Sequence, residues 1–109
     1  MAQPESKLSR KIMDELRGAG CFCFKVWGSE HMMVGLPDII GCYRGMFFGL
    51  EVKMPDKRSN TSARQEHVMN LIRDAGGCSQ VVCSPREALA AILDCYNLMT
   101  FGIGVDDDD

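Results

Sequence analysis

The chain of 109 residues has room for one compact domain with a modest core and leaves none for a second. Hydrophobic residues make up 46% and charged residues 25%, as in ordinary globular proteins, and no apolar run approaches the roughly 20 residues that span a bilayer. Because the N-terminal segment also lacks the apolar core of a secretory signal, we expect a cytoplasmic protein with no membrane partner.

The net charge of −3 does not by itself indicate a nucleic-acid binder. However, residues 106–109 are a run of aspartates, which we expect to be a solvated acidic tail after a single domain over 1–105. Without this tail, 12 basic side chains stand against 11 acidic ones. Four basic residues lie close together in the sequence: Lys53, Lys57, Arg58 and Arg64. This local patch is either a phosphate-binding surface or a solvated loop.

Apolar residues at helical spacing predict an N-terminal helix from Pro4 to about Arg17, ended by the glycines that follow. The aromatic and cysteine-rich stretch 21–27 predicts a strand, and 28–37 predicts a loop. All six cysteines have apolar neighbours and none has zinc-site spacing, so we expect buried free thiols.

The second half of the chain predicts a hairpin followed by a crossover. Two strands, 38–43 and 46–53, flank a tight turn at Arg44 and Gly45. A polar loop, a helix over 62–75, a short strand over 80–83 and a helix over 85–98 follow. The order α-β-β-β-α-β-α predicts an α/β fold, with a mixed four-stranded sheet flanked by helices.

The predicted hairpin brings two acidic residues together. With a two-residue turn, pairing outward along the strands places Asp38 directly opposite Glu51, with Cβ atoms about 5 Å apart. Carboxylates this close repel unless a positive charge lies between them, and a hard cation such as Mg²⁺ fits there. A bulge after Gly45 would shift this register.

Lys53 is expected on the same face of the strand as Glu51. Phe48, Leu50 and Val52 alternate along the strand and form the face that packs on the core. Glu51 and Lys53 therefore point to the other side. An ammonium group there can orient a water molecule and stabilise negative charge on a phosphate, so the pattern suits phosphodiester hydrolysis.

Each part of this pattern also has a simpler structural explanation. Glu51 and Lys53 alone are typical of a surface ion pair, and Pro37-Asp38 alone is typical of a turn. The combination is more specific, because the acidic residue leads into an apolar strand, a glycine turn follows, and the next strand ends in Glu-Val-Lys.

Segments 35–41 (Gly-Leu-Pro-Asp-Ile-Ile-Gly) and 49–53 (Gly-Leu-Glu-Val-Lys) resemble the core motif of the PD-(D/E)XK nuclease superfamily. More closely, nearly the whole chain resembles the stand-alone VRR-NUC domain of phages and of larger DNA-repair nucleases. The resemblance implies a restriction-endonuclease-like core and one or two Mg²⁺ or Mn²⁺ ions. It implies these catalytic residues: Glu5, Asp38, Glu51, Lys53 and Gln65. It also implies that Asp38, Glu51 and the main-chain carbonyl of Val52 bind the metal.

Two of these residues have local alternatives. Glu5 lies in the middle of the apolar stripe of the first helix and faces inward, but it is also a favourable charge in a first helical turn. Its rival Glu15 lies at the edge of the stripe. Gln65 fits a capping box that starts at Ser62, a role compatible with one in the site.

Further residues are candidates for contact with DNA. Lys25 ends the first strand, and we group it with Lys57, Arg58 and Arg64 as phosphate-binding residues. Trp27 is expected in the core or at its rim rather than as a base-stacking platform. His31 and His67 lack partner spacing and are expected at the surface.

The leading hypothesis is a metal-dependent, structure-selective endonuclease acting on branched DNA such as four-way junctions. The resemblance implies a homodimer, which suits symmetric cleavage, acting in the host cytoplasm if the chain is phage-encoded. The apolar side of the last helix, with Leu89, Ile92, Leu93 and Tyr96, is the expected place for the dimer contact. The alternatives are a non-catalytic DNA-binding module that retains the fold and a metal-free interaction domain.

Overall fold

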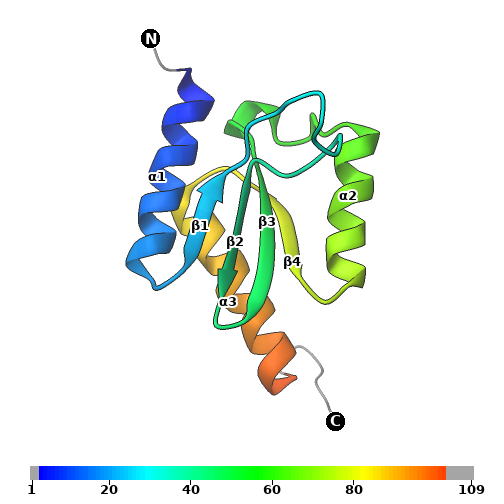
Figure 1. Ribbon diagram of the computed structural model, residues 1–109. Helices are drawn as coiled ribbons and strands as arrows, with labels where there is room; N and C mark the ends of the chain where they lie inside the picture. The colour runs from blue at the N-terminus through cyan, green and yellow to red at the C-terminus, as the bar shows by residue number, and fades with distance from the viewer. Residues whose placement is uncertain (1–2, 103–109) are drawn as a thin grey trace.

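The computed structural model describes residues 3–102, which form a four-stranded sheet with helices on both faces (Figure 1). In chain order the elements are α1 (Pro4–Gly18), β1 (Phe22–Lys25), β2 (Ile39–Tyr43), β3 (Met46–Val52), the 3-10 helix η1 (Pro55–Lys57), α2 (Ala63–Asp74), β4 (Cys78–Val82) and α3 (Pro85–Phe101). The predicted order of helices and strands is confirmed. The predicted acidic tail at 106–109 lies outside the described residues.

Some boundaries differ from the predictions because pairing and packing set them. β4 begins at Cys78 rather than Gln80, since Cys78 already pairs with Phe48 of β3. α3 continues past Leu98 to Phe101, where Gly102 ends it with a φ of 65°. β1 ends at Lys25, two residues short of the predicted strand end.

The sheet has the strand order β1-β2-β3-β4. β1, β2 and β3 are antiparallel neighbours, and α2 crosses over to bring β4 parallel to β3. This is the predicted meander followed by a βαβ crossover.

The turn between β2 and β3 fixes the register of the hairpin. Arg44 and Gly45 have φ values of 50° and 88°, so both central residues are left-handed, as a two-residue type I′ hairpin turn requires. Tyr43 pairs with Met46 and Ile39 with Leu50, with no bulge between them. The predicted register is therefore confirmed for the paired residues, and Asp38 and Glu51 directly follow the last pair, Ile39 and Leu50.

The main core lies between one face of the sheet and helices α1 and α3, which also pack on each other (Figure 1). Its fully buried members include Ile12 and Leu16 of α1, Phe48 and Leu50 of β3, and Ile92 of α3. On the opposite face, α2 packs on β3 and β4 and buries Val68 and Met69. No helix within residues 3–102 is long and apolar enough to cross a membrane.

Two sequence-based expectations about surfaces are wrong. Cys42 is exposed, while Cys21, Cys23, Cys78 and Cys83 are buried, and all six cysteines are free thiols. Ile92, expected in the dimer contact, is fully buried in the core. Tyr96 of the same helix packs edge-on against Tyr43, with ring centroids 5.2 Å apart, so this side of α3 is already in use within the chain.

Candidate active site

Four segments reach the same end of the sheet: the start of α1, the start of β2, the end of β3 and the start of α2 (Figure 1). These segments carry Glu5, Asp38, Glu51 with Lys53, and Gln65, in that order. The sheet topology therefore gathers the residues that the sequence spreads over sixty positions.

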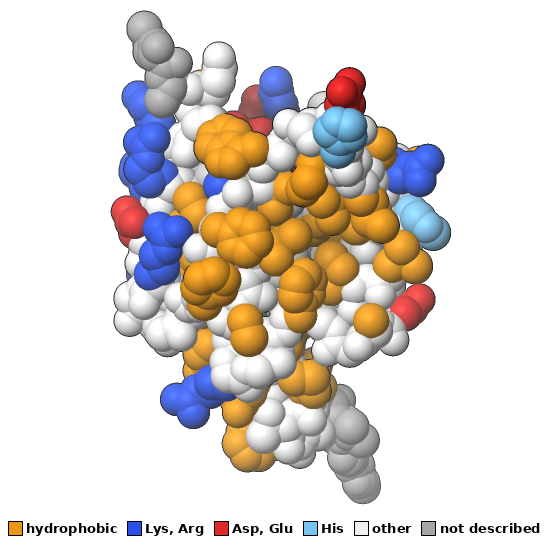
Figure 2. Space-filling model, in the orientation of Figure 1, with side chains coloured by type: hydrophobic (Ala, Val, Ile, Leu, Met, Phe, Trp, Pro, Cys, Tyr) orange, Lys and Arg blue, Asp and Glu red, His pale blue; other side chains and the backbone are white. Residues whose placement is uncertain are grey.

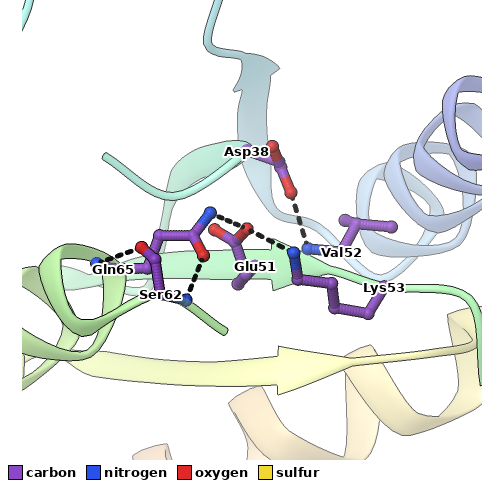
Figure 3. Close-up of polar contacts among 6 residues, drawn as sticks. All are labelled: Asp38, Glu51, Val52, Lys53, Ser62 and Gln65. Atoms are coloured by element: carbon purple, nitrogen blue, oxygen red, sulfur yellow. Dashed lines mark hydrogen bonds and ion pairs between the residues drawn. The ribbon is translucent and has the colours of Figure 1, made fainter. Parts of the chain in front are cut away.

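Asp38 is held against β3 by its neighbours in the chain. Pro37 is fully buried over Gly49, where a side chain on the glycine would come within 2.7 Å of the proline ring. This close approach brings Asp38 beside the end of β3, and its Oδ2 accepts a hydrogen bond of 2.8 Å from the backbone N–H of Val52 (Figure 3). One carboxylate oxygen is thereby fixed, and the other has no hydrogen-bond partner within residues 3–102.

Glu51 is a buried carboxylate, with only 2% of the residue exposed. Its Oε2 accepts a hydrogen bond from Nε2 of Gln65 and lies 3.6 Å from the ammonium of Lys53 (Figure 3). Burial, followed by the charge of Asp38, raises the pKa of Glu51 to about 7, although Lys53 opposes both effects. The single ammonium group does not offset the cost of burying this negative charge.

Gln65 serves the helix and the site at once. Ser62 Oγ accepts from the N–H of Gln65 at 3.1 Å, and Gln65 Oε1 accepts from the N–H of Ser62 at 2.9 Å, so the predicted capping box is confirmed. With its oxygen held in this way, the amide presents its Nε2 to Glu51 (Figure 3).

Glu5 lies in the first turn of α1 and is half-buried, whereas its rival Glu15 is exposed. The negative charge of Glu5 raises the pKa of Glu51, as the smallest of the effects that do so. The half-burial of Glu5 leaves its role in the site a prediction.

The donors at this site suit a hard divalent cation. Asp38 and Glu51 supply carboxylate oxygens, and the N–H of Val52 points at Asp38. Because the N–H and C=O of one residue point to the same side of an extended strand, the carbonyl of Val52 also faces Asp38. Residues 3–102 contain no group of three His, Cys, Asp or Glu side chains arranged to hold a metal. Two carboxylates and one carbonyl are donors that suit an ion such as Mg²⁺, which keeps several water ligands.

The four basic residues predicted to bind DNA have different surroundings. Lys25 Nζ donates to Ser9 Oγ at 3.4 Å and lies 5.6 Å from the ring centre of Trp27. Arg58 forms a bidentate ion pair with Glu87, with distances of 2.7 and 3.0 Å. Lys57 and Arg64 are exposed on the segments that follow Lys53.

Trp27 and the two histidines are all exposed to solvent. Trp27 is 75% exposed, so it lies at the rim of the site and not in the core. Its neighbour Val26 donates its N–H to the carbonyl of Asp38 at 2.8 Å, which ties the end of β1 to the acidic residue. His31 and His67 are exposed, as expected.

Ser9 was missed at the level of sequence. It is 1% exposed and is the polar partner of Lys25, so it links α1 to the end of β1 beside the site. Its position offered a signal, because Ser9 falls in the stripe of Glu5, Ile12 and Leu16 at spacings of three and four residues. A polar residue in a buried stripe requires a partner.

These observations define the class of the fold: a mixed four-stranded α/β core flanked by helices, with two acidic side chains and a lysine at the end of a hairpin. Comparison of the sequence with family models and with curated proteins gives no match. Among solved structures, a VRR_NUC domain superposes with a TM-score of 0.63 at 24% identity, covering 84% of this chain and 97% of that one. Hjc, a Holliday junction resolvase from Archaeoglobus fulgidus, superposes with a TM-score of 0.51 at 20% identity, covering 72% and 66%.

Proposed function

We propose that this protein is a metal-dependent, structure-selective endonuclease that hydrolyses phosphodiester bonds in branched DNA such as four-way junctions. The observation that carries the proposal is the buried carboxylate of Glu51, which contacts Lys53 and Gln65 and lies opposite Asp38. The fold shared with a VRR_NUC domain and a junction resolvase supports the same activity.

Asp38, Glu51 and the carbonyl of Val52 would hold Mg²⁺ or Mn²⁺, as one ion or two, and the bound metal would lower the pKa of water and polarise the phosphoryl oxygen. Lys53 presents its ammonium on the same face as Glu51, where it orients the attacking water and stabilises charge on the phosphate. Gln65 fixes the orientation of Glu51. Glu5, the fifth proposed catalytic residue, adds negative charge at the rim of the site.

The DNA backbone would be held by Lys25, Lys57, Arg58 and Arg64, which flank the acidic residues. Arg64 and Lys57 are exposed and offer their full charge, whereas the pairing of Arg58 with Glu87 reduces what Arg58 contributes. Contacts of this kind recognise the position of phosphates and not the sequence of bases. We therefore propose recognition by shape, by a homodimer acting in the cytoplasm.

The test is a cleavage assay on single-stranded, duplex, flap and four-way DNA with Mg²⁺, Mn²⁺ or EDTA. We expect cleavage of branched DNA that requires the metal and is lost in Asp38→Asn, in which the amide oxygen still accepts from Val52. Asp74→Asn, at the far end of α2, is the matched control and keeps full activity. Full activity of Asp38→Asn would remove the site assignment. Metal-independent binding without cleavage would favour a non-catalytic DNA-binding module.

A further inference from the structure

Trp27, the one tryptophan of the chain, is exposed beside the acidic residues. It follows β1, which ends at the side of the sheet where β2 begins (Figure 1). Val26, the residue before it, donates its N–H to the carbonyl of Asp38 at 2.8 Å. An indole gains much from burial, yet Trp27 is 75% exposed. A large apolar ring therefore stands in solvent one residue away from a hydrogen bond to the candidate active site.

A cavity lies between the chain neighbours of Trp27 and the acidic site. It has a volume of about 270 Å³, and its lining includes Val26 and Gly28, on either side of Trp27, together with Asp38. A nucleotide that rests against the indole therefore has room for its sugar and phosphate beside Asp38.

A positive charge is fixed over the ring. Lys25 Nζ lies 5.6 Å from the ring centre of Trp27, within the about 6 Å at which an indole face attracts an ammonium group. Ser9 of α1, which is 1% exposed, accepts a hydrogen bond of 3.4 Å from the same ammonium. Because the cation takes one face of the indole, the exposed surface of the ring lies on its other face and its edges.

The other aromatic rings lack this combination. Figure 2 shows hydrophobic side chains gathered at the centre of one face of the molecule, with Lys and Arg towards the margins. Within residues 3–102, no phenylalanine ring has a Lys or Arg over it. The other ring with a cation over it, that of Tyr43, flanks the hairpin turn at the opposite end of β2 from the acidic site. At the acidic end of the sheet, the combination is found at Trp27.

An exposed indole beside a lysine suits a nucleic-acid base whose face is free. Every base has a π-face that stacks on an aromatic ring, and cations nearby hold the phosphates of the same strand. In a continuous duplex each base is already stacked on its neighbours, and separating them costs free energy. At a branch point or an unpaired nucleotide, a base face is open before the protein binds. An exposed indole therefore favours such DNA over continuous duplex.

We propose that Trp27 stacks on a base left open at the branch point of the DNA and so selects branched DNA over continuous duplex. Lys25 then contacts the phosphate next to the stacked base. From the sequence we expect Trp27 in the core or at its rim, and its exposure and the cation over its ring change that expectation. The inference rests on the proposed function for its substrate class, but stacking itself requires neither a metal nor cleavage.

The first test needs no substitution, because the tryptophan fluorescence of this protein comes from Trp27 alone. The protein is titrated in EDTA with a four-way junction, with a duplex that holds one unpaired adenine, or with a continuous duplex, and anisotropy of labelled DNA gives the bound fraction. At equal bound fraction, we expect the first two DNAs to quench the emission and the continuous duplex to leave most of it. The same emission with all three, or no binding of the junction, would overturn the proposal.

The second test measures the affinity of variants for the same DNAs. We expect Trp27→Ala to bind the junction about 10-fold or more weakly and the continuous duplex within about 2-fold of the wild type, because stacking is lost only where a base face is free. Phe101→Ala, at a ring that is 67% exposed at the end of α3 away from the acidic site, is the matched control with unchanged affinities (Figure 1). Equal losses on both DNAs in Trp27→Ala would assign this residue a structural role and contradict the proposal.

Cleavage assays separate this inference from the proposed function. A junction that quenches Trp27 and is never cut with Mg²⁺ or Mn²⁺ would keep the stacking role and remove the nuclease function. Cleavage by Trp27→Ala that still prefers the junction over the continuous duplex would keep the nuclease function and remove the role of Trp27.

Discussion

Glu51 combines two conditions that a carboxylate ordinarily avoids, since it is buried and it lies opposite a second acidic side chain. The hydrogen bond from Gln65 and the ammonium of Lys53 satisfy its oxygen, but its pKa still stands at about 7. A carboxylate in this environment is a candidate for a catalytic or metal-binding role and not for a stabilising one. Binding of a proton or of a positive ion at Glu51 lowers the free energy of the folded protein.

This environment predicts how pH affects the stability of the metal-free protein. The folded carboxyl has a pKa of about 7 against a reference value of 4.5, so its stabilising contribution is complete below 4.5 and is lost as pH rises through 7. Glu51→Gln removes the charge and keeps the shape. In EDTA we expect this variant to melt above the wild type at about pH 8 and to show little gain at about pH 5. Equal gains at both pH values in calorimetric melts would show that the charge of Glu51 is not the cause.

Lys53 should matter for cleavage and not for metal affinity. Its ammonium lies 3.6 Å from Glu51 and is not a ligand, because a cation repels it. We expect Lys53→Ala to slow cleavage by about 100-fold or more, while titration calorimetry shows Mn²⁺ affinity within a few-fold of the wild type. Lys11→Ala, an exposed lysine on α1, is the control with unchanged kinetics. Equal losses of affinity and rate would assign Lys53 a different role.

At the level of elements, the first turn of α2 joins folding to the site. Its capping box satisfies backbone N–H groups at the start of the helix and at the same time fixes the amide of Gln65. α3 has a similar cap, since Ser84 Oγ accepts from the N–H of Glu87 at 3.0 Å. Within residues 3–102, neither Ser84 nor Glu87 forms a hydrogen bond with Asp38 or Glu51. The two caps therefore provide a matched pair.

Loss of either cap should cost similar stability and have different effects on activity. Ser62→Ala and Ser84→Ala each remove a side-chain cap, which is worth about 1 kcal/mol, and we expect melting temperatures to fall by about 4–8 °C in a domain of this size. Ser62→Ala alone should also slow cleavage, since loss of the bond to Ser62 Oγ loosens the turn in which the backbone N–H of Ser62 holds the Gln65 amide. Denaturation curves with cleavage rates at low temperature separate the two effects. Equal slowing in both variants would show that stability alone sets the rate.

For the molecule as a whole, a divalent ion that binds only the folded state must stabilise it. Mn²⁺ at about 100 times its dissociation constant stabilises by about 2.7 kcal/mol, which raises the melting temperature by about 10–20 °C. We expect this rise in the wild type and in Asp74→Asn and its absence in Asp38→Asn. Scanning calorimetry with Mn²⁺ against EDTA checks it. A rise that survives in Asp38→Asn would place the ion elsewhere.

The features that rest on local chemistry could be predicted from the amino-acid sequence. Two residues that adopt left-handed φ values, Arg44 and Gly45, set the hairpin register, and this register brings Asp38 and Glu51 to the same end of the hairpin. Alternation along β3 correctly put Lys53 on the face of Glu51. Ser62 and Gln65 carried the capping box in their spacing alone. Each of these depends on neighbours within a few residues, which is why a pattern in the chain predicts them.

The features that depend on contacts between distant segments could not be predicted from the sequence and follow from the packing of the chain. The burial of Glu51 and its raised pKa come from packing around the end of β3, and the partner of Arg58 is Glu87 on another helix. The exposure of Phe22 and Phe24 follows only from the position of α2, which packs on β3 and β4. A strand with aromatic residues has the same sequence pattern whether or not a helix packs on its face, because the packing of helices on a sheet depends on the whole fold.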